Sequence, residues 1–138
     1  MLVYEELQAG QWLKPLVKDP VSKVQLVKYA GASGDFNPLH TDDAFAQKIG
    51  MQGVIAHGML VMGFLGEYAM KLAGDSAILT NFKMRFGAVT VPRDSITCSA
   101  IVNKLYEDDG QRFVSLDLFA EKGPEQVVGS GQVVLQFQ

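Results

Sequence analysis

The stretch HGMLVMGFLGEYAMKLAG (57–74) is the longest helical segment of the sequence, and it decides the fold. Its only charged residues are Glu67 and Lys71, which are four residues apart and therefore share one face of a helix. Gly74 follows as a C-terminal stop signal. A helix that is apolar almost all round is buried rather than laid on a surface. The sequence therefore predicts a central helix over 57–73 that the rest of the chain covers.

Everything after this helix has the pattern of β-strands. Alternation is clearest where apolar side chains at 114, 116, 118 and 120 face away from the polar ones at 115, 117 and 121. Short turns separate four long runs, which cover 77–91, 95–106, 112–121 and 126–137. Long strands between short turns predict an antiparallel meander, and one buried helix before it predicts an α+β fold with the sheet wrapped around that helix.

The segment before the central helix is predicted to be mixed. We expect a short first strand over 11–18 and then, after Asp19-Pro20, a helix from an N-cap at Ser22 to about Ala32. A brief helix over 43–49 ends at Gly50. Between the two helices, GASGDFNPLHTDD (31–43) is rich in Gly, Asp and Asn and is predicted to be a turn-dense loop.

Composition limits the class of protein. The 138 residues are typical of one domain, so we expect a single domain over 1–138. The net charge is −3 and no Lys/Arg cluster is present, so nucleic acid is not an expected partner. The longest apolar run, 54–64, is too short for a bilayer, and the N-terminus lacks a basic signal region, so no membrane partner is expected. The single Cys98 permits no intrachain disulfide and is predicted to be a small buried hydrophobe; we expect a cytoplasmic protein.

Both histidines of the chain, His40 and His57, lie between Gly31 and Gly58, the same stretch that holds the turn-dense loop. Asp35 and His40 are five residues apart across Asn37-Pro38, and proline forces the preceding residue towards an extended conformation. The chain can therefore double back and bring a carboxylate and an imidazole to one water, which suits acid–base catalysis. The pattern alone leaves a structural alternative open, in which Asp35 caps the turn and His40 is a hydrogen-bonded framework residue.

Gly58 opens the central helix, whose first backbone N–H groups are unpaired and lie at its positive end. Without a side chain, Gly58 permits a ligand oxygen to approach its N–H, as an oxyanion hole requires. The alternative is that Gly58 only permits tight packing. We expect His57 to be a structural cap or turn anchor, and Met59 and Met62 to fill the core or to line an acyl tunnel.

Other site chemistries are not indicated. No Cys pair, H-x₃-H or HExxH spacing exists, so no metal is expected. The sequence lacks G-x-S-x-G, so a Ser–His–Asp hydrolase is not expected. It also lacks G-x-G-x-x-G and the P-loop, so no nucleotide cofactor, and no other cofactor, is expected.

YAGASGDFNPLHTDDAFA (29–46) followed by IAHGMLVMGFLG (55–66) resembles the signature of the MaoC-like (R)-specific enoyl-CoA hydratases. It is also similar to the catalytic subunit of mycolic-acid-type (3R)-hydroxyacyl dehydratases. The resemblance implies a hot-dog fold, hydration of trans-2-enoyl thioesters or dehydration of (3R)-hydroxyacyl thioesters, a catalytic pair of Asp35 and His40, and Gly58 as oxyanion donor. We also expect Asn37, Met59 and Arg85 to contact the substrate.

The resemblance further implies a homodimer, or a dimer of dimers, in which two sheets join edge to edge and the acyl chain enters near the interface. Two positions depart from the family pattern. Gly66 stands where some members have a serine, and Arg93 replaces the glycine of a Pro-Gly-Asp turn, where it is either a solvated turn residue or a contact for a ligand phosphate.

Two alternative functions stay open on the sequence. A hot-dog thioesterase would need a carboxylate on the central helix, and Glu67 is the only one there. A non-catalytic partner subunit of a heterodimeric dehydratase would not need the Asp35–His40 pair. The sequence does not decide whether the acyl carrier is coenzyme A or acyl carrier protein, nor the chain length.

Overall fold

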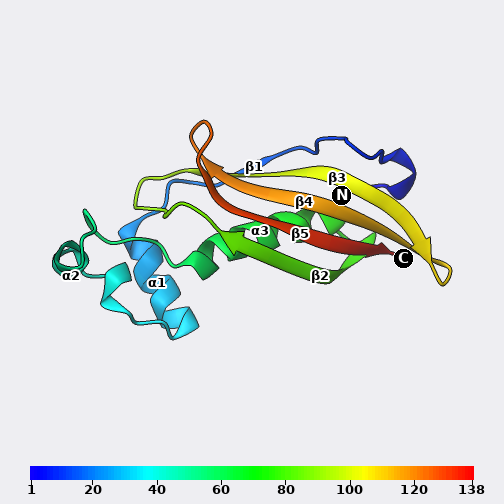
Figure 1. The fold of residues 1–138 in the computed structure, drawn as a ribbon. Coiled ribbons are helices and arrows are strands. Elements are labelled where there is room, and N and C mark those ends of the chain that lie inside the picture. The colour runs from blue at the N-terminus through cyan, green and yellow to red at the C-terminus, as the bar shows by residue number, and fades with distance from the viewer.

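The computed structural model describes all 138 residues, and its centre is one helix held in the hollow of a curled sheet. Helix α3 (Gly58–Ala73) lies along the concave face of a five-stranded antiparallel sheet (Figure 1). This arrangement confirms the predicted α+β hot-dog fold. The strands are β1 (Leu16–Val17), β2 (Ala77–Phe86), β3 (Ile96–Asp108), β4 (Gln111–Lys122) and β5 (Val127–Phe137).

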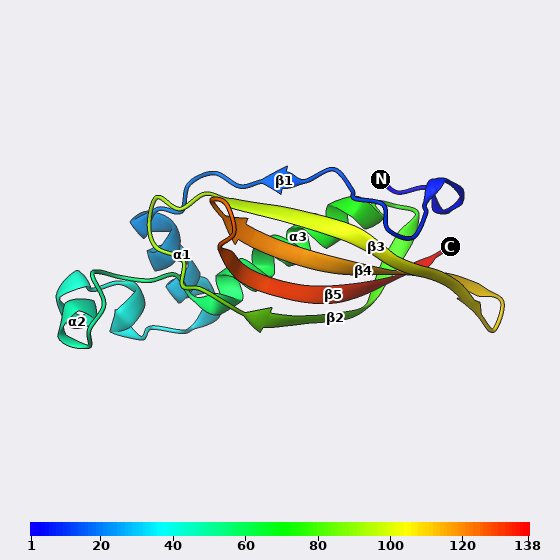
Figure 2. The same cartoon turned by 45° about the horizontal axis from the view of Figure 1, so that its top comes forward.

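Two shorter helices lie together at one end of the sheet, as Figures 1 and 2 show. Helix α1 spans Lys23–Ser33, and its predicted N-cap is confirmed because the Ser22 hydroxyl accepts a hydrogen bond from the Gln25 N–H at 3.0 Å. Helix α2 spans Asp43–Lys48, with Asp42 as its N-cap. These helices flank the turn-dense loop that the sequence predicted.

The core forms between α3 and the inner face of the sheet. The four alternating apolar residues of β4 that the sequence assigned to one face are all fully buried: Val114, Leu116, Leu118 and Ala120. Cys98 is fully buried on β3 as predicted, and burial raises the pKa of its thiol to about 11. The thiol therefore stays protonated near neutral pH and packs as a small apolar group.

Helix α3 is buried on one side only, so the prediction of all-round burial is wrong for the single chain. Its sheet-facing residues have at most 8% of their surface exposed, and they are Leu60, Val61, Phe64, Leu65, Tyr68, Ala69 and Ala73. On the other side Met59 and Met70 are 54% and 56% exposed. No helix has both the length and the apolar character that crossing a membrane requires.

The strand order corrects the predicted meander. β3, β4 and β5 do follow one another through short turns, but β2 pairs with β5 at the far edge, giving the order β1-β3-β4-β5-β2 (Figure 2). β2 ends at Phe86, five residues earlier than expected. The connection 87–95 is too long for a hairpin and crosses the end of the sheet instead. The first strand is also shorter than predicted, with an isolated bridge at Trp12 beyond β1.

Two glycines provide a matched test of this packing. In β5, an added Cβ at Gly131 would lie 2.1 Å from the Lys83 carbonyl oxygen of β2, whereas one at Gly31 in α1 would meet nothing within 4 Å. We expect Gly131→Ala to lower the free energy of unfolding by about 2 kcal/mol or more through overpacking. Gly31→Ala should raise it by up to about 1 kcal/mol, because alanine favours helix. Urea denaturation measures both, and equal effects of the two variants would contradict this packing.

Candidate active site

The loop after α1 doubles back on itself as the sequence predicted. α1 ends at Gly34, which takes a left-handed conformation (φ 77°). Asn37 is extended (φ −55°, ψ 123°), and its side-chain oxygen accepts the Leu39 N–H at the start of a 3₁₀ turn over Pro38–His40. This turn reverses the chain, so that Asp35 Oδ2 lies 3.8 Å from His40 Nε2.

The His40 ring is held with its reactive nitrogen towards Asp35. Its Nδ1 lies 2.8 Å from the Ile55 carbonyl oxygen, which can only accept, so Nδ1 carries the proton and Nε2 is left bare in the neutral ring. Only 11% of the His40 side chain is exposed, against 53% for Asp35. The 3.8 Å separation is too long for a direct hydrogen bond. An oxygen atom placed between the two groups can contact both at hydrogen-bond distance.

His57 lies beneath this pair. Its ring stacks on His40, with centroids 3.8 Å apart and planes 24° apart, and it meets the Tyr29 ring edge-on at 4.8 Å. Its Nε2–H donates to the Asp35 carbonyl oxygen at 3.1 Å. His57 is the N-cap residue of α3, but its side chain makes no capping hydrogen bond. The sequence predicted either a cap or a turn anchor, and the structure shows the turn anchor.

Gly58 begins α3, and its N–H has no hydrogen-bond acceptor within the chain. That unpaired donor suits an oxyanion. An added Cβ would also lie 2.9 Å from Cε1 of the Phe86 ring, so tight packing requires glycine as well. The structure thus supports both explanations that the sequence left open. Met59 follows on the exposed side of the helix start.

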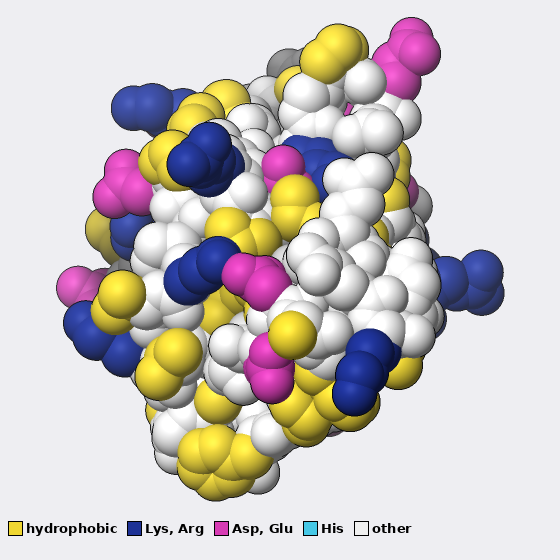
Figure 3. All heavy atoms as spheres, turned by 90° about the vertical axis from the view of Figure 1, so that its left-hand side faces the viewer, with side chains coloured by type: hydrophobic (Ala, Val, Ile, Leu, Met, Phe, Trp, Pro, Cys, Tyr) yellow, Lys and Arg dark blue, Asp and Glu magenta, His cyan; other side chains and the backbone are white.

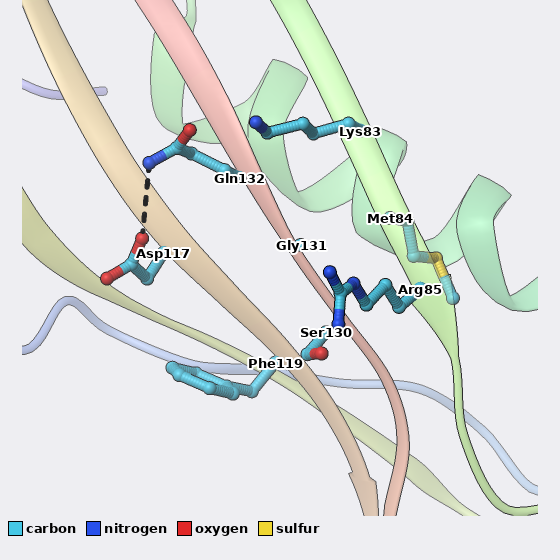
Figure 4. A pocket seen from close by; sticks show the side chains of 8 residues that line it. All are labelled: Lys83, Met84, Arg85, Asp117, Phe119, Ser130, Gly131 and Gln132. Atoms are coloured by element: carbon cyan, nitrogen blue, oxygen red, sulfur yellow. Dashed lines mark hydrogen bonds between the residues drawn. The ribbon is translucent and has the colours of Figure 1, made fainter.

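Arg85 does not join this site. Successive side chains of a strand point to opposite faces, so Phe86 lies against Gly58 while Arg85 lies on the outer face of the sheet. There it lines a groove of about 600 Å³ (Figure 4) formed by Lys83, Met84, Arg85, Asp117, Phe119, Ser130, Gly131 and Gln132. The expectation that Arg85 contacts a substrate bound at Asp35 and His40 does not agree with this placement.

Glu67, the acid that a thioesterase would need, is engaged elsewhere. Its carboxylate accepts a hydrogen bond from Lys18 Nζ at 2.8 Å and lies 3.3 Å from Lys71 Nζ. The Lys18 hydrogen bond holds the pKa of Glu67 below its usual range. Glu67 lies nine residues along α3 from Gly58, more than two helical turns, so it cannot act at the unpaired N–H.

Asp35, His40 and His57 can each place one ligand atom within 4.8 Å of the others, which raises the question of a metal site. A metal ion lies close to the ring plane of any histidine that binds it, about 2.0–2.1 Å from the nitrogen for zinc. Two stacked rings have planes that do not meet near the rings. One nitrogen of each ring also faces a carbonyl oxygen. The geometry favours acid–base chemistry over metal binding.

Sequence reasoning missed the partners that orient the pair. The Ile55 carbonyl that holds His40 carries no signal in a single sequence, because a main-chain oxygen exists at every residue. Tyr29 opens the quoted motif, but its contact with His57 depends on how α1 packs against the start of α3. Arg93 adopts the left-handed conformation (φ 80°) expected of the glycine that it replaces. Its N–H donates to the Val21 carbonyl oxygen, which ties the 87–95 connection to the segment before α1.

The end of the molecule that carries α1 and α2 shows mixed charged and hydrophobic side chains and no visible histidine (Figure 3). Both rings are therefore covered from this side. Three exposed apolar side chains neighbour the site residues in sequence or space: Phe36, Met59 and Phe86, with 54–70% of their surface exposed.

Comparison with known proteins gives consistent matches. The family model described as "MaoC like domain" matches residues 6–116. An (R)-specific enoyl-CoA hydratase from Aeromonas caviae is 30% identical over 95% of this chain and 97% of its own. Another, from Rhodospirillum rubrum, is 30% identical over 81% of this chain and 76% of its own. A solved (R)-hydratase structure from A. caviae superposes with a TM-score of 0.83 at 27% identity, covering 97% of this chain and 99% of that one.

The two histidines make the site geometry directly testable by NMR. Because His40 Nδ1 and His57 Nε2 each face a carbonyl oxygen, we expect the neutral rings to adopt opposite tautomers, Nδ1–H for His40 and Nε2–H for His57. Long-range ¹⁵N–¹H correlation spectra of a chain with only two histidines resolve both rings. Identical tautomers in the two rings would contradict this arrangement.

Proposed function

The chain belongs to the MaoC-like domain family, and from this premise we propose that it is a hydro-lyase: it adds water to trans-2-enoyl thioesters and removes it from (3R)-hydroxyacyl thioesters in fatty-acid metabolism. The observation that carries the proposal is the 3.8 Å separation of Asp35 Oδ2 and His40 Nε2, with both groups free to contact one oxygen atom. The relatives named above are enoyl-CoA hydratases, which supports coenzyme A as the acyl carrier.

The reaction follows from three groups around one substrate. The thioester carbonyl accepts a hydrogen bond from the Gly58 N–H, which draws electrons from Cβ of the enoyl group. Water held between Asp35 and His40 attacks Cβ, forming the C–O bond while the π-electron pair moves towards Cα and the carbonyl oxygen. The pair accepts one proton from the water and delivers one to Cα, so it returns to its starting protonation state. Dehydration is the reverse.

Neither alternative function gains support from the geometry. The thioesterase alternative rests on a carboxylate of the central helix, and Glu67, the only one there, is paired with Lys18 and Lys71. A non-catalytic partner subunit would not require the opposed Asp35 and His40 groups, and both are in place.

Asp35→Asn and His40→Gln test the proposed pair. Each variant keeps shape and hydrogen bonding but removes a proton-transfer group, which is typically worth about 10²–10⁴-fold in rate. We expect each variant to lower kcat for crotonyl-CoA hydration by at least about 10²-fold. The double variant should be little less active than the less active single variant, because the two residues act as a unit. Loss of the enoyl absorbance follows the reaction.

Circular dichroism provides the folding control for these variants, and chiral analysis of the wild-type product should give the (3R)-hydroxyacyl thioester. A well-folded single variant that kept more than about a tenth of wild-type kcat would rule out the pair, given the expected size of the effect. A mainly (3S) product, or thiol release without hydration, would rule out the activity itself.

We further propose that the active unit is a homodimer. β2 is a ten-residue edge strand with an unpaired side, and such edges are normally paired or covered. The exposed side of α3 carries Met59 and Met70 beside it. Phe36, next to Asp35 in the sequence, and Phe86, which lies against Gly58, are 70% and 56% exposed and would be covered by a second chain. A partner sheet at β2 would therefore complete both the core and the site.

Sedimentation equilibrium tests this assembly. Since one chain has a mass of 15.0 kDa, the expected species is about twice that mass, or a multiple of it for a dimer of dimers. An active 15.0 kDa monomer would contradict the proposal. Met70→Glu, on the exposed side of α3 and three turns from Gly58, should weaken the dimer through a buried unpaired charge.

A further inference from the structure

We propose that His57 is a positioning residue that holds Asp35 and His40 at their working separation, an inference that rests on the function proposed above. Its ring supports the His40 imidazole by stacking at 3.8 Å, and its Nε2–H holds the Asp35 main chain at 3.1 Å. One side chain therefore contacts both members of the pair.

His57 acts through these residues and not on the substrate. It is 2% exposed, and Tyr29 covers it edge-on from α1. It also lies at the start of α3, so its backbone fixes it relative to the Gly58 N–H. The two contacts thus tie the acid–base pair to the oxyanion donor. A substrate held at Gly58 then meets water at a fixed position between Asp35 and His40.

The residue type is explained by this double contact and not by packing alone. A phenylalanine would supply the stacking ring but no donor, and a glutamine would supply a donor at the Nε2 position but no ring. Histidine supplies both, and at a cost. Its buried Nδ1 has no hydrogen-bond partner, and neither has the buried Thr90 Oγ1 on the adjoining 87–95 connection. A residue chosen only to fill the core would not leave a buried nitrogen unpaired.

The predicted consequence is a loss of rate without a loss of binding. Displacing a catalytic group by about 1 Å can cost about 10²-fold in rate. Since His57 does not touch the substrate, KM should stay within about threefold of wild type, because uniform binding is unchanged.

Three variants separate the two contacts. His57→Phe keeps the ring and removes the donor. His57→Gln keeps a donor at the Nε2 position and removes the ring. His57→Asn is the matched control for His57→Gln, because its shorter amide cannot reach the Asp35 carbonyl oxygen and it also lacks the ring. We expect kcat to fall about 10-fold or more in the Phe and Gln variants and about 10²-fold in the Asn variant.

Thermal unfolding distinguishes positioning from a structural role. The Phe variant fills the ring's volume and removes the unpaired Nδ1, which offsets the lost bond to the carbonyl oxygen of the exposed Asp35, so its Tm should stay near that of wild type while its kcat is lower. A structural role predicts instead that kcat follows Tm and that the Phe variant is fully active.

Two results would overturn the proposal, because displacing a catalytic group is expected to lower kcat by up to about 10²-fold. One is a folded His57→Phe variant whose kcat is within about twofold of wild type. The other is a His57→Asn variant that is as active as His57→Gln. Asp35→Asn, assayed alongside, separates the two proposals. If Asp35→Asn is inactive and the His57 variants are unaffected, only the positioning role fails. If Asp35→Asn is active, the proposed function itself fails.

Discussion

The three residues that precede α3 hold the site together through hydrogen bonds to two distant segments. The Ile55 carbonyl fixes the His40 ring, and the Ile55 N–H donates to the Leu39 carbonyl oxygen at 3.2 Å. The Ala56 N–H donates to the Thr90 carbonyl oxygen at 2.7 Å, and His57 holds Asp35. The loop after α1 and the 87–95 connection are therefore both attached to the start of the buried helix. These bonds add to the turn's own hydrogen bonds and fix the loop, in which 53% of the Asp35 side chain is exposed, relative to α3.

The helix can serve as this anchor because the sheet immobilises it. Leu65 and Ala69 are fully buried against the strands, and the Tyr68 hydroxyl donates to the Lys14 carbonyl oxygen at 2.8 Å. Burial raises the pKa of Tyr68 to about 12, so this hydrogen bond persists through the neutral range. A close-packed core of this kind has low compressibility, so the helix cannot shift without disturbing its neighbours. The unpaired Gly58 N–H is thereby presented at a fixed point, as transition-state stabilisation requires.

The features that the sequence predicted correctly are those fixed by residues close together in the chain. The Asn37-Pro38 step restricts its own backbone, so the approach of Asp35 and His40 followed from the six residues 35–40. The alternation of β4 likewise identified its buried face. The position of β2 beside β5 could not be predicted, because it depends on where a nine-residue connection crosses the sheet. Arg85 was expected to contact the substrate, but strand alternation directs its side chain to the opposite face from Phe86, the residue that lies against Gly58. The exposed side of α3 was missed because only Glu67 and Lys71 are charged on it, while Met59 and Met70 are as apolar as the residues of the buried side.

The unpaired polar atoms of His57 and Thr90 indicate that the residues of this region serve catalysis at the expense of stability. Each buried polar group without a partner costs about 1–3 kcal/mol, a large fraction of the stability of a domain this size. Natural sequences keep such violations mainly where function requires them. Here both lie within the few residues that connect the acid–base pair, the oxyanion donor and the 87–95 connection. The rest of the core follows ordinary packing, with apolar side chains on the inner faces of β3, β4 and β5. The local departure from those rules coincides with the place where Asp35, His40 and Gly58 meet, and that coincidence supports assigning the chemistry to these three residues.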